Sequence, residues 1–228
     1  MVRYSLRDSN GRSSSHRRTY SLRAMKVIIV RHGRTQGNTE RRYVGCRTDE
    51  PLLASEYDEI QLAEMAAGNV ILCISPMLRA RQTAEIMCPG MEQTVIDDLR
   101  ETDFGEFEGR TYEELNRDPV LSEDYQAWID SGGTMKIPGG ESMDESSARS
   151  MRGFAKAVSL AAHQAADGLV IIAHGGTVMA VMSSLFGGSY YDYYAGNGEG
   201  YTFELEVDDA GNITAAGTYD RFCGRIRA

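Results

Sequence analysis

The amino-acid sequence predicts an α/β fold with a mainly parallel sheet that helices cover on both faces. Three short runs of β-branched and aliphatic residues are typical of strands buried on both faces: Lys26–Val30, Val70–Ile74 and Leu169–Ala173. Helical segments separate these runs, and strands that alternate with helices form parallel sheets. Hydrophobic residues make up 42% and charged residues 25% of the 228 residues, which suits one compact globular domain.

The helices follow from spacing and from their start signals. Met77–Met87 is predicted to be a helix with Ser75 as its N-cap and Pro76 at its first position. Three further segments have helical spacing: Ala54–Ala67, Met143–Ala166 and Thr177–Phe186.

Two regions depart from the alternation of strand and helix. Residues 101–140 are rich in Glu, Gly and Tyr, with short helical pieces at Tyr112–Asn116 and Asp124–Ile129, and we interpret them as a short lid over a site. Tyr201–Val207 and Ile213–Tyr219 alternate as expected for a hairpin at the edge of the sheet.

Charge divides the chain into two parts. Residues 1–24 contain six arginines and one acid, Asp8, which leaves 18 basic and 32 acidic residues and a formal charge of −14 for residues 25–228. We interpret residues 1–24 as a flexible basic extension or an over-long start, with a targeting segment as the alternative. An acidic body argues against nucleic-acid binding. If it handles phosphate esters, its positive charge must gather in a pocket.

Cysteine usage and hydropathy bear on location. The chain has no apolar run long enough to span a bilayer, so we expect no membrane partner. The four cysteines form no CxxC pair, which favours a cytoplasmic protein with unpaired thiols and argues against a zinc site; they are Cys46, Cys73, Cys88 and Cys223.

Two of the predicted strands end in the same pattern. Lys26–Val30 runs into Arg31-His32-Gly33, and Leu169–Ala173 runs into His174-Gly175-Gly176. Carboxyl ends of parallel strands face one crevice, and a glycine at a helix start lets backbone N–H groups approach an anion. The repeated pattern favours a shared site over two histidines satisfied in the core. A metal site at His32 and His174 is the alternative, although the HxxxH spacing of a helical ligand pair is missing.

The segment Ser75–Ala84 borders the same edge of the sheet. Arg79 and Arg81 lie on different faces of its helix, so only one of them can point inward. Arginine suits phosphate because its planar fork donates two hydrogen bonds to neighbouring oxygens.

Five motifs in order now resemble a known family. They are Arg31-His32-Gly33 followed by Asn38, the SPMLRARQTA segment, Glu101 ahead of FGEFEG, PGGES at Pro138–Ser142, and AHGGT at Ala173–Thr177. This set is similar to the histidine phosphatase superfamily, the phosphoglycerate mutase-like group with the RHG motif. Within it, the short lid and PGGES resemble the α-ribazole phosphatase and broad-specificity branches. The resemblance implies a three-layer α/β/α sandwich.

The resemblance also implies the roles of individual residues. His32 would be the nucleophile that accepts the phosphoryl group, and Glu101 would be the proton donor. No metal or cofactor is implied. The groups that would bind the phosphoryl oxygens are Arg31, Asn38, Arg79, His174 and the backbone N–H of Gly175. Positioned positive groups fit a transition state whose negative charge spreads over three oxygens. A donor carboxyl needs a raised pKa, and three acids follow Glu101 closely in sequence: Asp103, Glu106 and Glu108.

Further residues bear on the pocket and its specificity. Asn197 is a loose candidate for a late asparagine that the family often has near its pocket. Five aromatic residues could form an apolar rim for a leaving group or simply pack the lid: Phe104, Phe107, Tyr112, Tyr125 and Trp128.

We therefore predict a metal-independent phosphomonoesterase that hydrolyses small-molecule phosphate esters, with α-ribazole phosphate as a candidate, and acts as a monomer or homodimer. Only three basic residues lie between Gly109 and Pro138, which favours a phosphatase over the alternative, a cofactor-dependent phosphoglycerate mutase; they are Arg110, Arg117 and Lys136. A binding protein without turnover is a further alternative. A serine hydrolase would need a GxSxG elbow, which the sequence lacks.

Overall fold

The computed structural model describes residues 22–53 and 68–223, and their strands form one six-stranded sheet in the order β3-β2-β4-β1-β5-β6. The strands are β1 (Arg23–Arg31), β2 (Val70–Ile74), β3 (Gln93–Val95), β4 (Gly168–Ala173), β5 (Glu199–Val207) and β6 (Ile213–Cys223). Strands β3, β2, β4 and β1 are parallel neighbours, whereas β5 and β6 extend the sheet as an antiparallel pair. The predicted mainly parallel sheet and its edge hairpin are confirmed.

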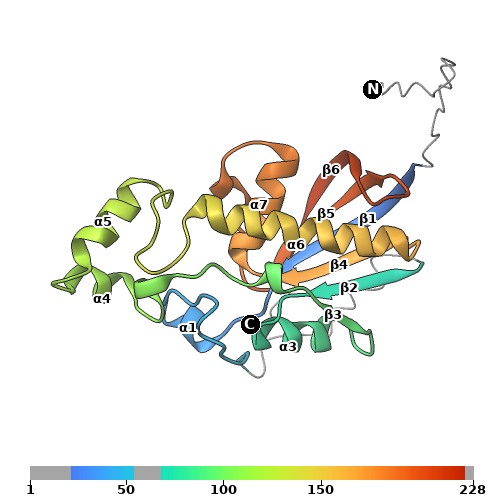
Figure 1. Ribbon diagram of the computed structural model, residues 1–228. Coiled ribbons are helices and arrows are strands. Elements are labelled where there is room, and N and C mark those ends of the chain that lie inside the picture. Colours follow the sequence, from blue (N-terminus) through green and yellow to red (C-terminus); the bar gives the residue numbers. More distant parts are fainter. Residues whose placement is uncertain (1–21, 54–67, 224–228) are drawn as a thin grey trace, which may run out of the picture.

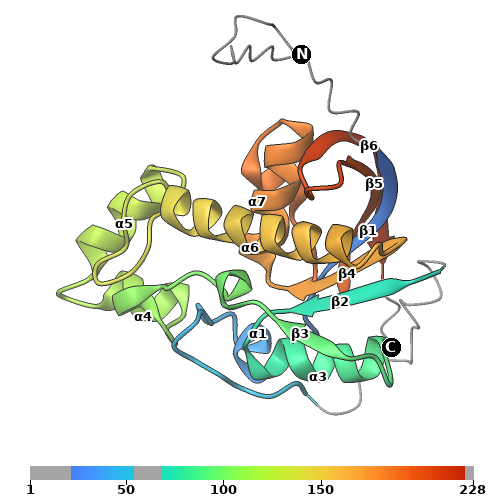
Figure 2. The same cartoon turned by 45° about the vertical axis from the view of Figure 1, so that its right-hand side comes forward.

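Helices cover both faces of this sheet because successive residues of its central strands point to opposite faces and are apolar on both. Ile28 and Val30 of β1 face α3 (Leu78–Met87), while Val27 and Ile29 face α6 (Met143–His163) and α7 (Gly175–Phe186). Figures 1 and 2 show α6 on one face of the sheet and α3 on the opposite face. The three-layer α/β/α sandwich is therefore confirmed.

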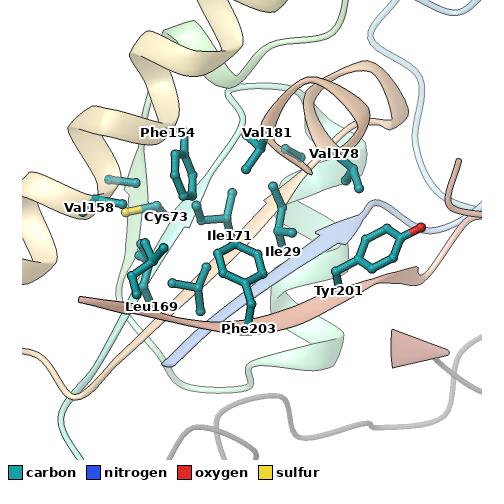
Figure 3. Close-up of a cluster of buried hydrophobic side chains, with 14 of the residues drawn as sticks. Ile29, Cys73, Phe154, Val158, Leu169, Ile171, Val178, Val181, Tyr201 and Phe203 are labelled. Atoms are coloured by element: carbon teal, nitrogen blue, oxygen red, sulfur yellow. The ribbon is translucent and has the colours of Figure 1, made fainter. Parts of the chain in front are cut away.

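The larger core lies between the sheet and the pair α6 and α7. Figure 3 shows Phe154 of α6 and Val181 of α7 packed over Ile29, Ile171 and Phe203 of the sheet. None of these side chains is more than 3% exposed. This packing fixes α6 and α7 against the two central strands, β1 and β4, whose carboxyl ends carry the two histidines.

The segment 101–140 forms a helical module beyond the carboxyl ends of the parallel strands (Figures 1 and 2). It contains α4 (Tyr112–Arg117) and α5 (Ser122–Asp130), close to the predicted helical pieces. A small core of its own holds it together, made of Phe107, Leu115, Leu121, Tyr125 and Ile137.

The start of α3 differs from the prediction. The helix begins at Leu78 with Met77 as its N-cap, so Ser75 is not the cap and Pro76 is not the first helical residue. The Ser75 hydroxyl instead lies 2.6 Å from Nε2 of His174, and this contact holds Ser75 outside the helix.

Other boundaries shift by a few residues. Helix α6 ends at His163, three residues before the predicted Ala166, and Ala165 then takes a left-handed conformation with φ of 52°. The short strand β3 and the short helix α1 (Gln36–Thr39) were not predicted. The predicted helix Ala54–Ala67 lies outside the described residues, as does most of the basic extension, residues 1–21. No helix in the described ranges combines the length and apolarity needed to cross a bilayer.

Candidate active site

The register of the two central strands brings His32 and His174 together. Arg31 at the end of β1 pairs with Ala173 at the end of β4, and each histidine is the next residue in its chain segment. Their ring centroids lie 5.1 Å apart, and the residues are 3% and 0% exposed. The two strand ends thus build one buried histidine pair, as the repeated sequence pattern predicts.

The hydrogen bond of His32 leaves one of its ring nitrogens free to act as a nucleophile. Its Nδ1 lies 2.6 Å from the carbonyl oxygen of Gly33. A carbonyl can only accept, so Nδ1 carries the hydrogen and Nε2 carries the lone pair. Burial holds the pKa of His32 well below its ordinary value of 6.5, and the charges of Arg79 and Arg31 lower it further. His32 is therefore a neutral imidazole at neutral pH.

His174 is held by a residue that sequence reasoning assigned to another role. Its Nε2 lies 2.6 Å from the Ser75 hydroxyl at the end of β2, while its buried Nδ1 has no hydrogen-bond partner within the described part of the chain. Burial and the charge of Arg79 lower the pKa of His174 well below 6.5. The position of Ser75 directly after an apolar strand, like that of both histidines, is the signal that could have identified it.

Two arginines bring positive charge into this acidic protein. Arg79 is fully buried and donates from its Nη atoms to the carbonyls of Thr48 (2.8 Å) and Gly45 (3.0 Å). Arg31 donates from Nη1 to the carbonyl of Ala195 at 2.9 Å. Arg81 is exposed, which confirms that only one arginine of its helix points inward.

Three polar atoms in this site are buried and unpartnered within residues 22–53 and 68–223: Nε of Arg31, Nε of Arg79 and Nδ1 of His174. A buried donor without an acceptor costs about 1–3 kcal/mol, so such atoms in a folded protein call for an explanation. All three belong to residues that the sequence resemblance assigns to phosphoryl oxygens. A phosphoryl group would supply acceptors to all of them.

An acidic residue of the FGEFEG segment supports Arg79 indirectly. Glu108 accepts hydrogen bonds at Oε1 from the backbone N–H groups of Gly45 (2.8 Å) and Thr48 (3.0 Å). These are the two residues whose carbonyls hold the Arg79 guanidinium. Sequence reasoning treated Glu108 only as a possible neighbour of Glu101 and missed this contact.

Two asparagines and a threonine hold the loop after β1. Asn197 donates from Nδ2 to Oδ1 of Asn38 at 3.0 Å and to the carbonyls of His32 and Gly33 at 3.2 and 3.3 Å. Thr83 of α3 accepts the N–H of Gly33 at 2.9 Å. Asn197 therefore lies at the pocket, in the loop before β5 and not on a strand.

Glu101 and Arg31 approach the first turn of α7 from different sides. A Cβ on Gly176 would stand 2.8 Å from Oε1 of Glu101, whereas one on Gly175 would stand 3.6 Å from Nε of Arg31. Oε1 of Glu101 accepts the backbone N–H of Thr102 at 2.8 Å. The start of α7 thus has the carboxylate and the guanidinium on different sides.

The acids that follow Glu101 have other partners. Asp103 pairs with Arg47 at 2.7 Å, and Glu106 is exposed. With Glu108 bound to the loop at Gly45, these three acids, which follow Glu101 closely in sequence, lie in three different surroundings.

The aromatic residues that could have formed a rim instead pack against one another, which was the alternative for them. Phe104, Phe107, Tyr125 and Trp128 pack on Tyr43 and on one another in the module 101–140.

Two tyrosines of the segment between α7 and β5 contact site residues. Tyr190 donates to the carbonyl of Gly176 at 3.2 Å, and the ring centroid of Tyr194 lies 5.8 Å from Cζ of Arg31. The YYDYY run at residues 190–194 was the available sequence signal.

The described residues contain no group of three or more His, Cys, Asp and Glu side chains that could hold a metal ion.

A family profile, that of the histidine phosphatase superfamily (branch 1), matches residues 27–207. The chain belongs to this superfamily.

Individual histidine phosphatases and their relatives resemble the chain over most of its length. A Klebsiella pneumoniae protein named "Probable phosphoglycerate mutase GpmB" is 34% identical over 172 residues, which cover 72% of this chain and 75% of that protein. The structure of a phosphoglycerate mutase from Thermus thermophilus is 30% identical with a TM-score of 0.55, over 86% of this chain and all of the other.

A third relative shows the fold alone. The α-ribazole phosphatase of Shigella flexneri has a TM-score of 0.67 at 23% identity, covering 88% of this chain and 96% of its own. These histidine phosphatase relatives thus carry phosphatase and mutase names on one fold, so the reaction of this member must be argued from its site.

Proposed function

We propose that this chain is a metal-independent phosphomonoesterase that transfers the phosphoryl group of a small-molecule ester to His32 and then to water. The observation that carries the proposal is the neutral, Nδ1-fixed imidazole of His32 beside three buried unpartnered polar atoms, on Arg31, Arg79 and His174. Phosphoryl transfer requires a nucleophile together with hydrogen-bond donors and positive charge around the transferred group.

In the first step, Nε2 of His32 attacks phosphorus and the bond from phosphorus to the ester oxygen breaks. Arg31, Arg79 and His174 bind the phosphoryl oxygens as negative charge builds on them, with Asn38 and the N–H of Gly175 assisting. The N-terminus of α7 adds the positive end of a helix dipole. The product is a phosphohistidine and a departing alkoxide.

Glu101 completes the cycle by moving protons. Its carboxyl group protonates the leaving oxygen, and the resulting carboxylate takes a proton from the water that attacks the phosphohistidine. Inorganic phosphate then leaves and His32 returns to its neutral form.

The substrate class follows from the surroundings of the pocket. Two of the three basic residues between Gly109 and Pro138 form ion pairs: Arg110 with Asp118, and Lys136 with Glu145. This segment therefore offers little free positive charge for a second phosphate, which favours a monophosphate ester of an uncharged alcohol. α-Ribazole phosphate is a candidate of this class, on the resemblance of the short lid and the PGGES segment to that branch of the family.

Phosphoglycerate mutase activity is a second candidate because relatives at 34% and 30% identity carry that name. The two reactions are separated by 3-phosphoglycerate followed by phosphorus NMR. A mutase forms 2-phosphoglycerate, whereas a phosphatase forms none and converts any 3-phosphoglycerate that it accepts to glycerate and inorganic phosphate.

The decisive experiment measures phosphate release from p-nitrophenyl phosphate in excess chelator, for the wild type and for His32→Ala. We expect turnover that the chelator does not change and that falls by about a thousandfold or more in the variant. Alkaline quenching of the wild type with labelled substrate should trap label on the protein that mild acid removes, as for a phosphohistidine. Turnover that survives in His32→Ala would rule out the mechanism.

A further inference from the structure

Behind Glu101 lies an ion pair that the reaction steps above do not use. Arg149 of α6 is 2% exposed, and its guanidinium donates to both oxygens of Glu141, Nε to Oε1 at 2.8 Å and Nη2 to Oε2 at 2.7 Å. Glu141 comes from the PGGES segment, at the far end of the module 101–140. The pair therefore joins α6 to the chain that leads out of that module.

The remaining N–H groups of Arg149 all point at the backbone just before and at Glu101. Nη1 donates to the carbonyls of Asp98 (3.1 Å) and Arg100 (2.7 Å), and Nη2 donates to the carbonyl of Glu101 at 3.2 Å. With the two bonds to Glu141, these contacts use all five donors of the guanidinium. Arg149 thus fixes three carbonyls within four consecutive residues.

Glu141 extends the same network to the other side of Glu101. Its Oε2 accepts the N–H of Asp103 at 3.0 Å, and its own N–H donates to the carbonyl of Asp103 at 2.9 Å. Residues 98 to 103 are therefore held on both sides of Glu101. Within this segment, the Glu101 side chain accepts the N–H of Thr102.

Stability gives little reason for this arrangement. A buried ion pair must overcome the desolvation of both charges, and apolar residues of similar volume often stabilise a protein as well or better. A buried ion pair that adds little stability can still fix the positions of neighbouring backbone groups, and such fixed positions are expected next to a residue that transfers a proton. Proton transfer needs its donor within hydrogen-bond distance of the leaving oxygen, and segment 98–103 carries the donor carboxyl.

We propose that Arg149 and Glu141 form a positioning clamp that holds Glu101 where it can protonate the leaving group. The inference rests on the proposed phosphatase function and adds two positioning residues to it. In the described part of the chain, neither residue hydrogen-bonds to His32, Arg31 or Arg79, and the charge of Arg149 makes the smallest contribution to the lowered pKa of His174. The clamp is therefore expected to act through Glu101.

If Arg149 and Glu141 position Glu101, their loss should slow the hydrolysis of esters with a strongly basic leaving group more than that of other esters. A weakly basic leaving group such as p-nitrophenolate departs without a proton, whereas an alkoxide does not. Loss of the proton donor therefore harms alkyl phosphates far more than p-nitrophenyl phosphate. Loss of phosphate binding or of nucleophilic attack harms both.

The experiment compares p-nitrophenyl phosphate with p-nitrobenzyl phosphate, which has nearly the same shape and a much more basic leaving group. The quantity compared is kcat/KM for p-nitrophenyl phosphate divided by kcat/KM for p-nitrobenzyl phosphate. It is measured for the wild type, Glu101→Gln, Arg149→Met, Glu141→Gln and a double variant of Glu101→Gln with Arg149→Met. Arg152→Gln is the matched control, since Arg152 lies on the same helix, is exposed and reaches Asp98 only at 4.0 Å.

We expect the ratio to rise by about tenfold or more in Arg149→Met and Glu141→Gln, and further in Glu101→Gln. Adding Arg149→Met to Glu101→Gln should leave the ratio where Glu101→Gln set it, because the clamp has no other route to the leaving group. Arg152→Gln should keep the wild-type ratio.

Several results would overturn the clamp. A folded Arg149→Met and Glu141→Gln that lose both substrates equally would show a purely structural role. An unchanged ratio in Glu101→Gln would mean that Glu101 is not the proton donor that the clamp serves. If Arg149→Met does not fold, Arg149→Lys and Glu141→Gln decide by the same ratio. Failure of the proposed function looks different, because the wild type would then turn over neither ester.

Discussion

The Ser75 hydroxyl lies where it can fix the tautomer of His174. Met77 donates its N–H to the Ser75 oxygen at 3.3 Å, and Ser75 lies 2.6 Å from Nε2 of His174. With Ser75 donating to Nε2, the ring proton stays on the buried Nδ1, which makes that atom a donor for a phosphoryl oxygen.

We therefore expect Ser75→Ala to lower kcat/KM for p-nitrophenyl phosphate by about tenfold, since it removes a hydrogen bond that fixes the tautomer of a ligand-binding histidine. Steady-state kinetics of the folded variant give the answer. Ser150→Ala changes another buried serine, whose hydroxyl lies 3.5 Å from Thr177, and is the matched control. Wild-type kcat/KM in Ser75→Ala would contradict the role assigned to Ser75.

At the scale of elements, the first turn of α7 has no room for a side chain next to Glu101. A Cβ at Gly176 would stand 2.8 Å from Oε1 of Glu101 and 3.3 Å from the Tyr190 hydroxyl. Alanine is the better helix former by about 1 kcal/mol, so the helix itself would tolerate the change.

Gly176→Ala should therefore keep or slightly raise the thermal midpoint while kcat on p-nitrobenzyl phosphate falls by about tenfold, because the carboxylate must move. Calorimetry and kinetics on one preparation separate the two effects. Gly217→Ala, where a Cβ would stand 3.6 Å from its nearest neighbour, provides the steric control. Full activity in Gly176→Ala would place Glu101 outside the reacting geometry.

The sequence could predict the elements that have a period or a strong start signal. Both ends of the buried strand Val70–Ile74 were predicted correctly, because a short apolar run that ends at Ser-Pro is typical of a buried strand. The short strand β3 could not be predicted, since three residues, Gln93–Val95, carry no period of their own and pair only because β2 lies beside them.

In the candidate site, the residues that belong to sequence motifs could be predicted, and those that contact the site from distant segments could not. His32, Arg31, Arg79, Asn38, His174 and Glu101 were named because motifs carry them, and the structure brings them to the carboxyl ends of β1, β2 and β4 and the start of α7. Ser75, Glu108 and Arg149 act through contacts between segments that are distant in sequence. The contacts of Glu108 and Arg149 leave no local pattern in the sequence, whereas Ser75 had a signal, its position directly after an apolar strand, and was interpreted as a helix cap instead.

At the scale of the whole molecule, the two buried histidines link folding stability to pH. Burial holds the pKa values of His32 and His174 well below 6.5 in the folded state. Below about pH 6.5 the unfolded chain takes up protons that the folded chain refuses. Stability linked to these groups is thus fully present above 6.5 and is lost as the pH falls toward the folded-state pKa values.

The free energy of unfolding should fall by about 1.4 kcal/mol per pH unit for each histidine below about pH 6.5. Urea unfolding between about pH 7.5 and pH 5.5 measures the slope, which His174→Asn should reduce. Val178→Ala, a cavity-forming change in the core, should lower stability at every pH without changing the slope. An equal slope in the wild type and His174→Asn would refute the link.

The position of β4 in the sheet has a consequence for the newly made chain. Strand β4 lies between β2 and β1, yet its residues 168–173 follow those of both neighbours, and Lys26 must find Gly168 as its partner. Until β4 has left the ribosome, β1 and β2 each expose an apolar edge with unpaired N–H and C=O groups, the kind of edge that recruits other chains. Insertion of β4 covers one edge of β1 and one edge of β2, and the same step brings His174 beside His32; the other edge of β1 stays unpaired until β5 follows.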